Sequence, residues 1–237
     1  MQTLRRTINA EEARHSQKER AYNVLTVVTG CASFIMVGLL LRREFFPSPN
    51  TRAIEVPTLD SKWQNCARVG TRIGRPDASV SILVFSDLEC PFCRRLHQAV
   101  DSMIREDSAG LSMTLVHSPI SGHRFALPTA RAAECAREQG KFAQMLSVLF
   151  TSQDSLGLLG WGTLANRAGV PDTSQLVGCQ RSDRKLAAIE KGQSATVEAK
   201  VSGTPTVIIN GWRFATPPST DTIGAIVQRV KANRPVY

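Results

Sequence analysis

The chain has 237 residues, 42% of them hydrophobic, which suffices for one domain of ordinary size with a buried core and additional segments. Its formal net charge is +9, but lysine and arginine are scattered and form no basic block interleaved with aromatic residues, which argues against nucleic-acid binding. Six cysteines are more than most cytosolic proteins of this size carry, which favours an oxidising compartment.

The N-terminal part of the chain contains one long apolar segment. Residues 1–20 are polar and mixed in charge, whereas residues 21–41 contain no charged residue. At a helical rise of about 1.5 Å per residue this segment is about 30 Å long, which matches the hydrocarbon thickness of a bilayer. A buried core helix is the alternative, but it would need a polar face that the segment lacks. We therefore expect a single transmembrane helix, with residues 1–20 as a cytoplasmic tail because basic residues are more numerous before the segment than after it.

The sequence indicates that this anchor is retained. No small-x-small cleavage site follows it, and the polar region before it is long for a signal peptide. Val28–Cys31 resembles a loose lipoprotein box, but the residues after Cys31 remain apolar where a lipoprotein would turn polar. Residues 42–69 are expected to be a linker, since prolines interrupt the pattern, although a short helix around Leu59–Val69 is compatible with it. Cys66 lies in this stretch without an obvious partner.

The motif with the clearest chemistry is Cys90-Pro91-Phe92-Cys93. It follows a strand-like run, Ser79–Phe85, and precedes a helical pattern from Arg94 to about Ser108. This order places Cys90 at the helix N-cap and Pro91 at the first helical position. A thiolate there faces free backbone N–H groups and the positive end of the helix dipole, which lower its pKa and make it an attacking sulfur. Cys93, one turn further on, is spaced to form a disulfide with Cys90.

Two other interpretations of the motif are weaker. A zinc site needs four ligands, and no second CxxC or close cysteine–histidine pair occurs in the sequence. A purely structural disulfide is poorly suited to a motif that begins a helix and is expected to be partly exposed. The sequence therefore favours redox chemistry, with no metal and no cofactor.

The rest of the chain is expected to alternate between strands and a long helical block. A second strand, Leu111–Val116, precedes this block, which covers about residues 120–200. Its expected helices are 128–139, 141–151, 161–168, 173–179 and 183–200. A third strand, Thr206–Ile209, leads through the hairpin signal Asn210-Gly211 into Trp212–Phe214, and Thr220–Ala232 closes the chain as a helix.

Several separated motifs resemble the DsbA-like branch of the thioredoxin fold. Asp87–Cys93 resembles its active-site segment, His123–Ala126 and Arg131–Ala136 the opening of its helical insertion, and Gly203–Thr206 its substrate-binding loop. Ile209-Asn210-Gly211 resembles the hairpin that follows. The resemblance covers about residues 70–233. It implies an α/β, thioredoxin-like domain over residues 70–237, with an inserted helical subdomain at about 120–200.

The resemblance also implies roles for individual residues. Cys90 would be the nucleophile and Cys93 the partner that resolves the mixed disulfide. Pro205 would be the cis-proline of the fold, although Thr204-Pro205 taken alone is also compatible with an ordinary turn. Substrate would contact Pro91, Phe92, Thr204 and Pro205, the backbone at Thr204 pairing with an extended segment. Cys135 and Cys179 would form a structural disulfide, the alternative being two inert buried thiols.

Phe92 is a departure from the strongest oxidants of this branch, which carry histidine at that position. Phenylalanine offers no hydrogen bond or charge to the thiolate, and the nearby acids Asp87 and Glu89 would disfavour it by like-charge repulsion. Asp87 is compatible with two roles, proton acceptor for Cys93 or surface loop acid. The three histidines His97, His117 and His123 are expected to be packing or surface residues.

The resemblance and the N-terminal segment together imply a membrane-anchored thiol–disulfide oxidoreductase on the periplasmic or extracellular side. It would exchange the Cys90–Cys93 disulfide with proteins that carry free or mispaired cysteines, most simply as an oxidase, and would depend on a redox partner protein. A reductase or isomerase with the same site is the close alternative, because sequence sets the redox direction only weakly. A peptide-binding, chaperone-like module is a different class that stays open.

Overall fold

The computed structural model describes residues 28–38, 56–107 and 110–237. The chain divides into two compact units, Met1–Ile54 and Glu55–Tyr237, which we describe separately. In the first unit, residues 28–38 are helical with exposed side chains. Within the described ranges no helix has both the length and the apolar character needed to cross a bilayer. The tail at 1–20, the two ends of the apolar segment 21–41, and residues 42–55 of the expected linker lie outside the described residues.

The second unit is built around a six-stranded sheet. Its strands are β1 (Thr58–Leu59), β2 (Thr71–Ile73), β3 (Val80–Ser86), β4 (Leu111–His117), β5 (Thr206–Ile209) and β6 (Trp212–Phe214). They lie in the order β1-β6-β5-β3-β4-β2, with β3 and β4 parallel and the other pairs antiparallel. The central strands β3 and β4 are nearly continuous runs of buried residues because helices cover both faces of the sheet.

Alternation along β3 divides the core into two layers. Ile82 and Val84 belong to the layer that includes buried residues of α3 (Pro91–Glu106) and α9 (Thr220–Lys231), whereas Leu83 and Phe85 belong to the layer on the opposite face. That opposite face is covered by α2 (Trp63–Ala67) and α8 (Ala187–Glu198). The resulting arrangement, helices on both faces of a mixed sheet, is the expected thioredoxin-like α/β fold.

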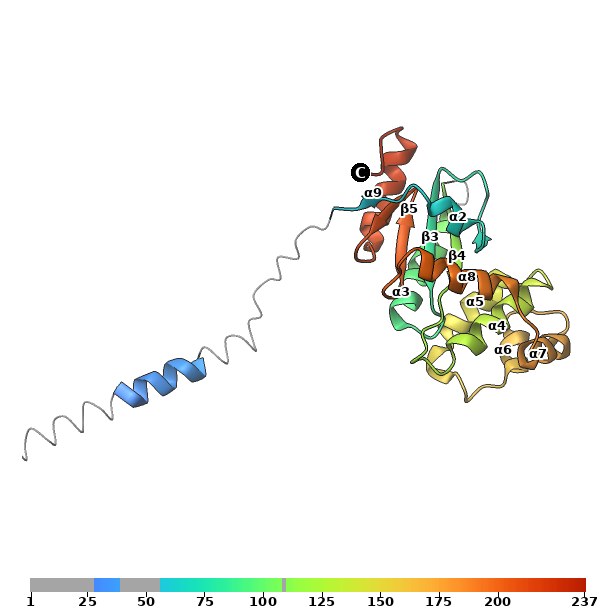
Figure 1. Cartoon of the computed structure of the whole chain (residues 1–237), viewed down its shortest axis with the longest axis horizontal. Helices are drawn as coiled ribbons and strands as arrows, with labels where there is room; N and C mark the ends of the chain where they lie inside the picture. The colour runs from blue at the N-terminus through green and yellow to red at the C-terminus, as the bar shows by residue number, and fades with distance from the viewer. Residues whose placement is uncertain (1–27, 39–55, 108–109) are drawn as a thin grey trace, which may run out of the picture. The chain divides into compact units, whose positions relative to one another are not determined.

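A block of helices is inserted between β4 and β5. Its members are α4 (Ala126–Arg137), α5 (Phe142–Thr151), the 3₁₀ turn η1 (Gln153–Ser155), α6 (Trp161–Arg167) and α7 (Thr173–Arg181). Figure 1 shows α4 to α7 gathered beyond one end of the sheet. Fully buried leucines hold them together: Leu146, Leu149, Leu164 and Leu176. The sequence predicted the helical character of the insertion, but the last helix expected within it, 183–200, corresponds to α8, which covers the sheet because its apolar residues pack with Leu83 and Phe85.

The compact domain begins earlier than the boundary expected at residue 70. β1 pairs with β6, and α2 buries Cys66 in the layer that contains Leu83 and Phe85. Part of the segment expected to be a linker, from Thr58 onward, is therefore built into the fold. A two-residue strand and a five-residue helix are too short to produce a periodic pattern, which is why the sequence did not separate them from the linker. The Cys66 thiol is free, and burial raises its pKa.

Candidate active site

Cys90 occupies the N-cap of α3. Its backbone is extended (φ −72°, ψ 124°), and Pro91 takes the first helical position, where its missing N–H costs no hydrogen bond. The Arg94 N–H donates to the Cys90 carbonyl at 3.1 Å and closes the first turn. Cys93, one turn further along α3, is 1% exposed, and the thiols of Cys90 and Cys93 are both free in this structure. The motif therefore has the local geometry that its sequence predicted.

The environment of Cys90 favours its thiolate. A hydrogen bond from the Cys93 thiol is the largest cause that lowers the pKa of Cys90, to about 5, against the opposing effect of burial. The backbone N–H groups of Cys93 and Phe92 and the Thr204 side chain lower this pKa further. The sequence predicted the contribution of the helix terminus. It did not show that the Cys93 thiol and a residue from a distant loop would also stabilise the thiolate.

Cys93 has the opposite character. Burial is the largest cause that raises the pKa of Cys93, and the neighbouring Cys90 raises it further, although a hydrogen bond from the Ser86 side chain acts the other way. At neutral pH the motif therefore consists of an ionised outer sulfur and a protonated inner one. This combination suits nucleophilic attack by Cys90, but it requires Cys93 to lose a proton before it can attack in turn.

The loop at Thr204 and Pro205 lies against the motif. The Thr204–Pro205 peptide bond is cis, and the Cys90 thiol donates a hydrogen bond to the Thr204 carbonyl at 3.4 Å, which joins residues 114 positions apart. Phe92 is 58% exposed, and the Arg95 guanidinium lies 4.7 Å from the centre of its ring. The structure therefore brings the residues predicted to contact substrate to one place, with Phe92 available at the surface.

Two residues of η1 hold the active-site loop from the side of the insertion. The Gln153 side-chain amide donates to the carbonyls of Leu88 and Cys90 at 2.8 and 3.1 Å. Next to it, Asp154 forms an ion pair with Arg94 at 2.9 Å. The sequence carried no signal for these contacts, because a glutamine and an aspartate some 60 residues from the motif are typical of any exposed turn.

The two acids before Cys90 also connect the loop to the insertion. Asp87 is 1% exposed, and its carboxylate accepts hydrogen bonds from the Ile120 N–H at 2.7 Å and the Glu89 N–H at 2.8 Å. It also lies 2.9 Å from Nδ1 of His123. The interpretation of Asp87 as a surface loop acid is therefore wrong.

Glu89 has a similar anchoring contact, since its carboxylate accepts a hydrogen bond from the Phe125 N–H. The hydrogen bonds to Cys90 outweigh the repulsion that the sequence predicted from Asp87 and Glu89, since the pKa of Cys90 is low. The two acids hold the start of the insertion against the active-site loop.

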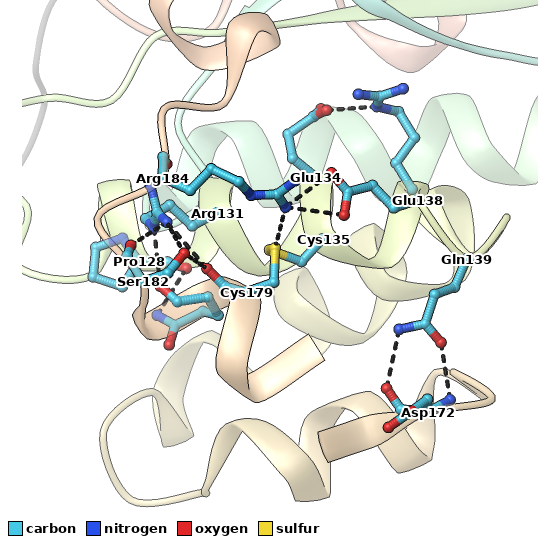
Figure 2. Close-up of a disulfide and its surroundings, with 12 residues drawn as sticks. Pro128, Arg131, Glu134, Cys135, Glu138, Gln139, Asp172, Cys179, Ser182 and Arg184 are labelled. Carbon is cyan, nitrogen blue, oxygen red and sulfur yellow. Dashed lines mark hydrogen bonds and ion pairs between the residues drawn. A yellow bond between two sulfur atoms is a disulfide. The ribbon is translucent and has the colours of Figure 1, made fainter. Parts of the chain in front are cut away.

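A disulfide joins Cys135 of α4 to Cys179 of α7, which is the pairing that the resemblance implied. Figure 2 shows two arginines beside it. The Arg131 guanidinium donates to main-chain carbonyls at and just after the end of α7, those of Cys179, Gln180, Ser182 and Arg184. Arg184 donates to the Cys179 sulfur at 2.8 Å and pairs with Glu138 at 2.9 Å. These contacts fasten the C-terminal end of α7 to α4.

We expect the Cys90 thiol of the reduced protein to titrate with a midpoint at about pH 5. Ultraviolet absorbance of the thiolate would measure it, and Cys90→Ser, which lacks the group, is the control. Because the unfolded thiol titrates at about 8.5, ionised Cys90 stabilises the reduced fold above that pH, and this stabilisation is lost as the pH falls through about 5. A midpoint near 8 or 9 would contradict the electrostatic account of the site.

Comparisons with known proteins bear on the same region. A family model described as thioredoxin matches residues 67–229. BdbD of Bacillus subtilis has a similar structure, with a TM-score of 0.60 and 20% identity over 74% of this chain and 97% of BdbD. The thiol-disulfide exchange protein α-DsbA2 of Wolbachia pipientis is also similar, with a TM-score of 0.59 and 16% identity over 72% of this chain and 92% of that protein. At these identities the two structures show a shared fold.

Among curated proteins, the Na(+)/H(+) antiporter NhaA 1 of Mycolicibacterium gilvum is 33% identical over 147 residues, which is 61% of this chain. The matched region is 24% of the antiporter, so the chain spans about a quarter of the length of that relative. The antiporter name describes a much longer protein.

Proposed function

The chain belongs to the thioredoxin family, and on this premise we propose that it is a DsbA-like thiol–disulfide oxidoreductase that oxidises cysteine pairs in other proteins outside the cytoplasm. The observation that carries the proposal is the contrast between Cys90, whose pKa is lowered to about 5, and Cys93, whose pKa is raised. Attack by a substrate thiolate on Cys90 would leave Cys93 as the departing sulfur. The reaction ends with a substrate disulfide and two cysteines reduced in this protein.

The direction of exchange follows from what stabilises the reduced form. A group that stabilises the Cys90 thiolate stabilises the reduced protein and so makes its disulfide more oxidising. The pKa of such nucleophilic cysteines runs from about 7 in thioredoxin to about 3.5 in DsbA. A value of about 5 lies between the two, which favours an oxidase of intermediate strength over a reductase. An isomerase would use the same residues, and the experiment below separates these roles.

Substrate would bind across Phe92 and the Thr204–Pro205 loop. Phe92 offers an exposed apolar surface next to Cys90, and the loop backbone lies beside the sulfur. An extended segment with a cysteine could pair with this backbone as an added strand while its neighbouring side chains contact Phe92. Proteins with free or mispaired cysteines are therefore the proposed substrates, and a separate redox protein would reoxidise the Cys90–Cys93 pair.

We place the domain outside the cytoplasm and tie it to the membrane through residues 21–41. The support is the absence of charged residues in that segment, its length, the basic residues before it and the disulfide within the domain. Residues 1–20 would then lie in the cytoplasm, and the chain between the anchor and β1 would be the linker.

Equilibration of the Cys90–Cys93 pair with glutathione buffers tests the proposal. An oxidase should remain largely reduced in buffers that oxidise thioredoxin, and each shift of about 30 mV corresponds to about 1.4 kcal/mol. Substrate proteins should gain disulfides with the wild type and not with Cys90→Ser. If Cys90→Ser supports its partners as well as the wild type does, the chaperone-like function is correct and the oxidase proposal fails.

A further inference from the structure

The inner cysteine raises a question that the motif does not answer. Cys93 is buried and its pKa is raised, yet it must lose a proton to attack a mixed disulfide on Cys90. Asp87, the proton acceptor considered from the sequence, already has three partners, the Glu89 and Ile120 N–H groups and His123. These contacts direct its carboxylate to the start of the insertion. This orientation favours another group as the acceptor of the proton.

A second buried acid–base pair lies on the sheet next to the motif. Nε2 of His117 is 3.0 Å from the Glu134 carboxylate, and the two side chains are 2% and 1% exposed. Glu134 also accepts hydrogen bonds from Arg137 at 2.5 Å and from Thr71 at 3.2 Å. Burying an ionisable pair is costly, and packing of α4 on the sheet does not require one.

The position of His117 links this pair to Cys93. β3 and β4 are parallel neighbours, and Ser86 lies directly opposite His117 in their register. Paired residues of adjacent strands share a face, and this face carries Val84, Leu115 and the buried side of α3. The Ser86 side chain is near enough to Cys93 to lower the pKa of that thiol. Ser86 is therefore a neighbour of the inner cysteine and lies opposite His117 on the adjacent strand.

The other ring nitrogen of His117, Nδ1, is free to accept a proton. Its Nδ1 is buried and has no hydrogen-bond partner within the part of the chain that the structure describes. Buried nitrogen atoms without a hydrogen-bond partner are rare in folded proteins, so this one needs an explanation. Around the pair, β2 contributes Thr71, α4 contributes Arg137, and α5 contributes the Phe142 ring, 6.3 Å from the imidazole. Arg137 is thus the charged group that neighbours the pair among the described residues, and its side chain is 48% exposed.

We propose that the His117–Glu134 pair is the proton acceptor of Cys93, reached through the Ser86 hydroxyl and one bridging water. The inference rests on the proposed exchange chemistry and extends it. When Cys93 attacks, its sulfur bonds to that of Cys90, the bond from Cys90 to substrate breaks, and the substrate sulfur leaves as a thiolate. The proton of Cys93 passes to Ser86, the hydroxyl proton of Ser86 passes to the bridging water, and that water gives a proton to Nδ1 of His117.

The charge balance explains why both partners are needed. Proton transfer converts neutral His117 to an imidazolium, which the Glu134 carboxylate stabilises. In the oxidative direction the same steps run backwards, so that Cys93 leaves as a thiolate and receives the proton from His117. The negative charge on the Cys93 sulfur is thereby removed. The Glu134 carboxylate then no longer faces an imidazolium, and Arg137 neutralises its charge. The pair acts through Ser86 and positions no substrate itself.

The test separates the two sulfurs by their kinetics. The reduced protein is mixed with a symmetrical aromatic disulfide whose released thiolate absorbs light. The first release reports attack by Cys90, and the second reports attack by Cys93 on the mixed disulfide. We expect Glu134→Gln to leave the first phase unchanged. Its second phase should be at least about tenfold slower at pH 6, within the range of general acid–base effects, and should approach the wild-type rate at high pH as hydroxide takes over.

Controls distinguish this role from a structural one. Glu138→Gln removes a different carboxylate, at the C-cap of α4, which pairs with Arg184 and not with His117. This variant should leave both phases unchanged. Ser86→Ala keeps the His117–Glu134 contact and should show the same pH-dependent loss, so it tests the proposal even if Glu134→Gln does not fold. The proposal would be overturned if the second phase were slowed equally at every pH, or if both Glu134→Gln and Ser86→Ala kept the wild-type pH profile. A missing first phase in the wild type would instead refute the oxidoreductase function.

Discussion

Cys93→Ala is expected to accumulate mixed disulfides between Cys90 and other proteins. Cys90 keeps its position at the start of α3, where the backbone N–H groups of residues 92 and 93 still favour its thiolate, so it still attacks. The sulfur that would displace the bound partner is gone, and the adduct persists. Non-reducing gel electrophoresis of cell extracts, followed by mass spectrometry of the adducts, would measure the result.

Cys93→Ala should also change the pKa of Cys90, which provides a second measurement. The hydrogen bond from the Cys93 thiol is the largest cause of the low pKa of Cys90, so this pKa should rise in Cys93→Ala. Adducts should consequently form more slowly at pH 6 than at pH 8, although they are not resolved at either pH. Cys90→Ser/Cys93→Ala is the control and should form none. Adducts at Cys66 or Cys31 in place of Cys90 would contradict the assignment of the nucleophile.

Removing the disulfide with Cys135→Ala/Cys179→Ala is expected to lower the free energy of unfolding by about 4 kcal/mol. The estimate follows from the chain entropy that a bridge between cysteines 44 positions apart removes from the unfolded state. For a domain of this size the loss corresponds to a decrease in Tm of about 10 °C. Urea denaturation of the oxidised wild type and the double variant would measure it.

A matched control separates the bridge from the loss of buried sulfur. Cys66→Ala removes a buried thiol that forms no disulfide and should cost about 1 kcal/mol, as small core deletions do. Cys179→Ala alone should cost nearly as much as the double variant, because either substitution opens the loop. A double variant as stable as the wild type would show that the Arg131 contacts to the end of α7 already hold α4 and α7 together.

The local elements were determined by the sequence because their signals are local. Alternation and apolar runs located β3, β4 and β5, and periodicity located the helices of the insertion. The order strand, CxxC and helix placed Cys90 at a helix N-cap, and proline at the next position reinforced that placement. The nucleophile could thus be named before any tertiary contact was known, since its activation depends first on its own helix.

The environment of the two sulfurs was decided only by tertiary structure. Whether Asp87 lies at the surface or is buried depends on Ile120 and His123, residues that follow it by more than thirty positions. The hydrogen bonds of Gln153 and Thr204 with Cys90 likewise join chain segments that meet only in the folded domain. Polar residues in such positions have no periodicity, so no pattern in the sequence distinguishes them from exposed ones.

The His117–Glu134 pair shows the same limit most clearly. In the sequence His117 is the last residue of an apolar strand, and Glu134 is one acid in a helix of alanines and arginines. Their contact arises because the fold brings Glu134 of α4 to the end of β4, where His117 lies opposite Ser86. The sequence by itself determined which residue attacks. Packing between distant segments decided how that residue is ionised and which groups can receive the proton of its partner.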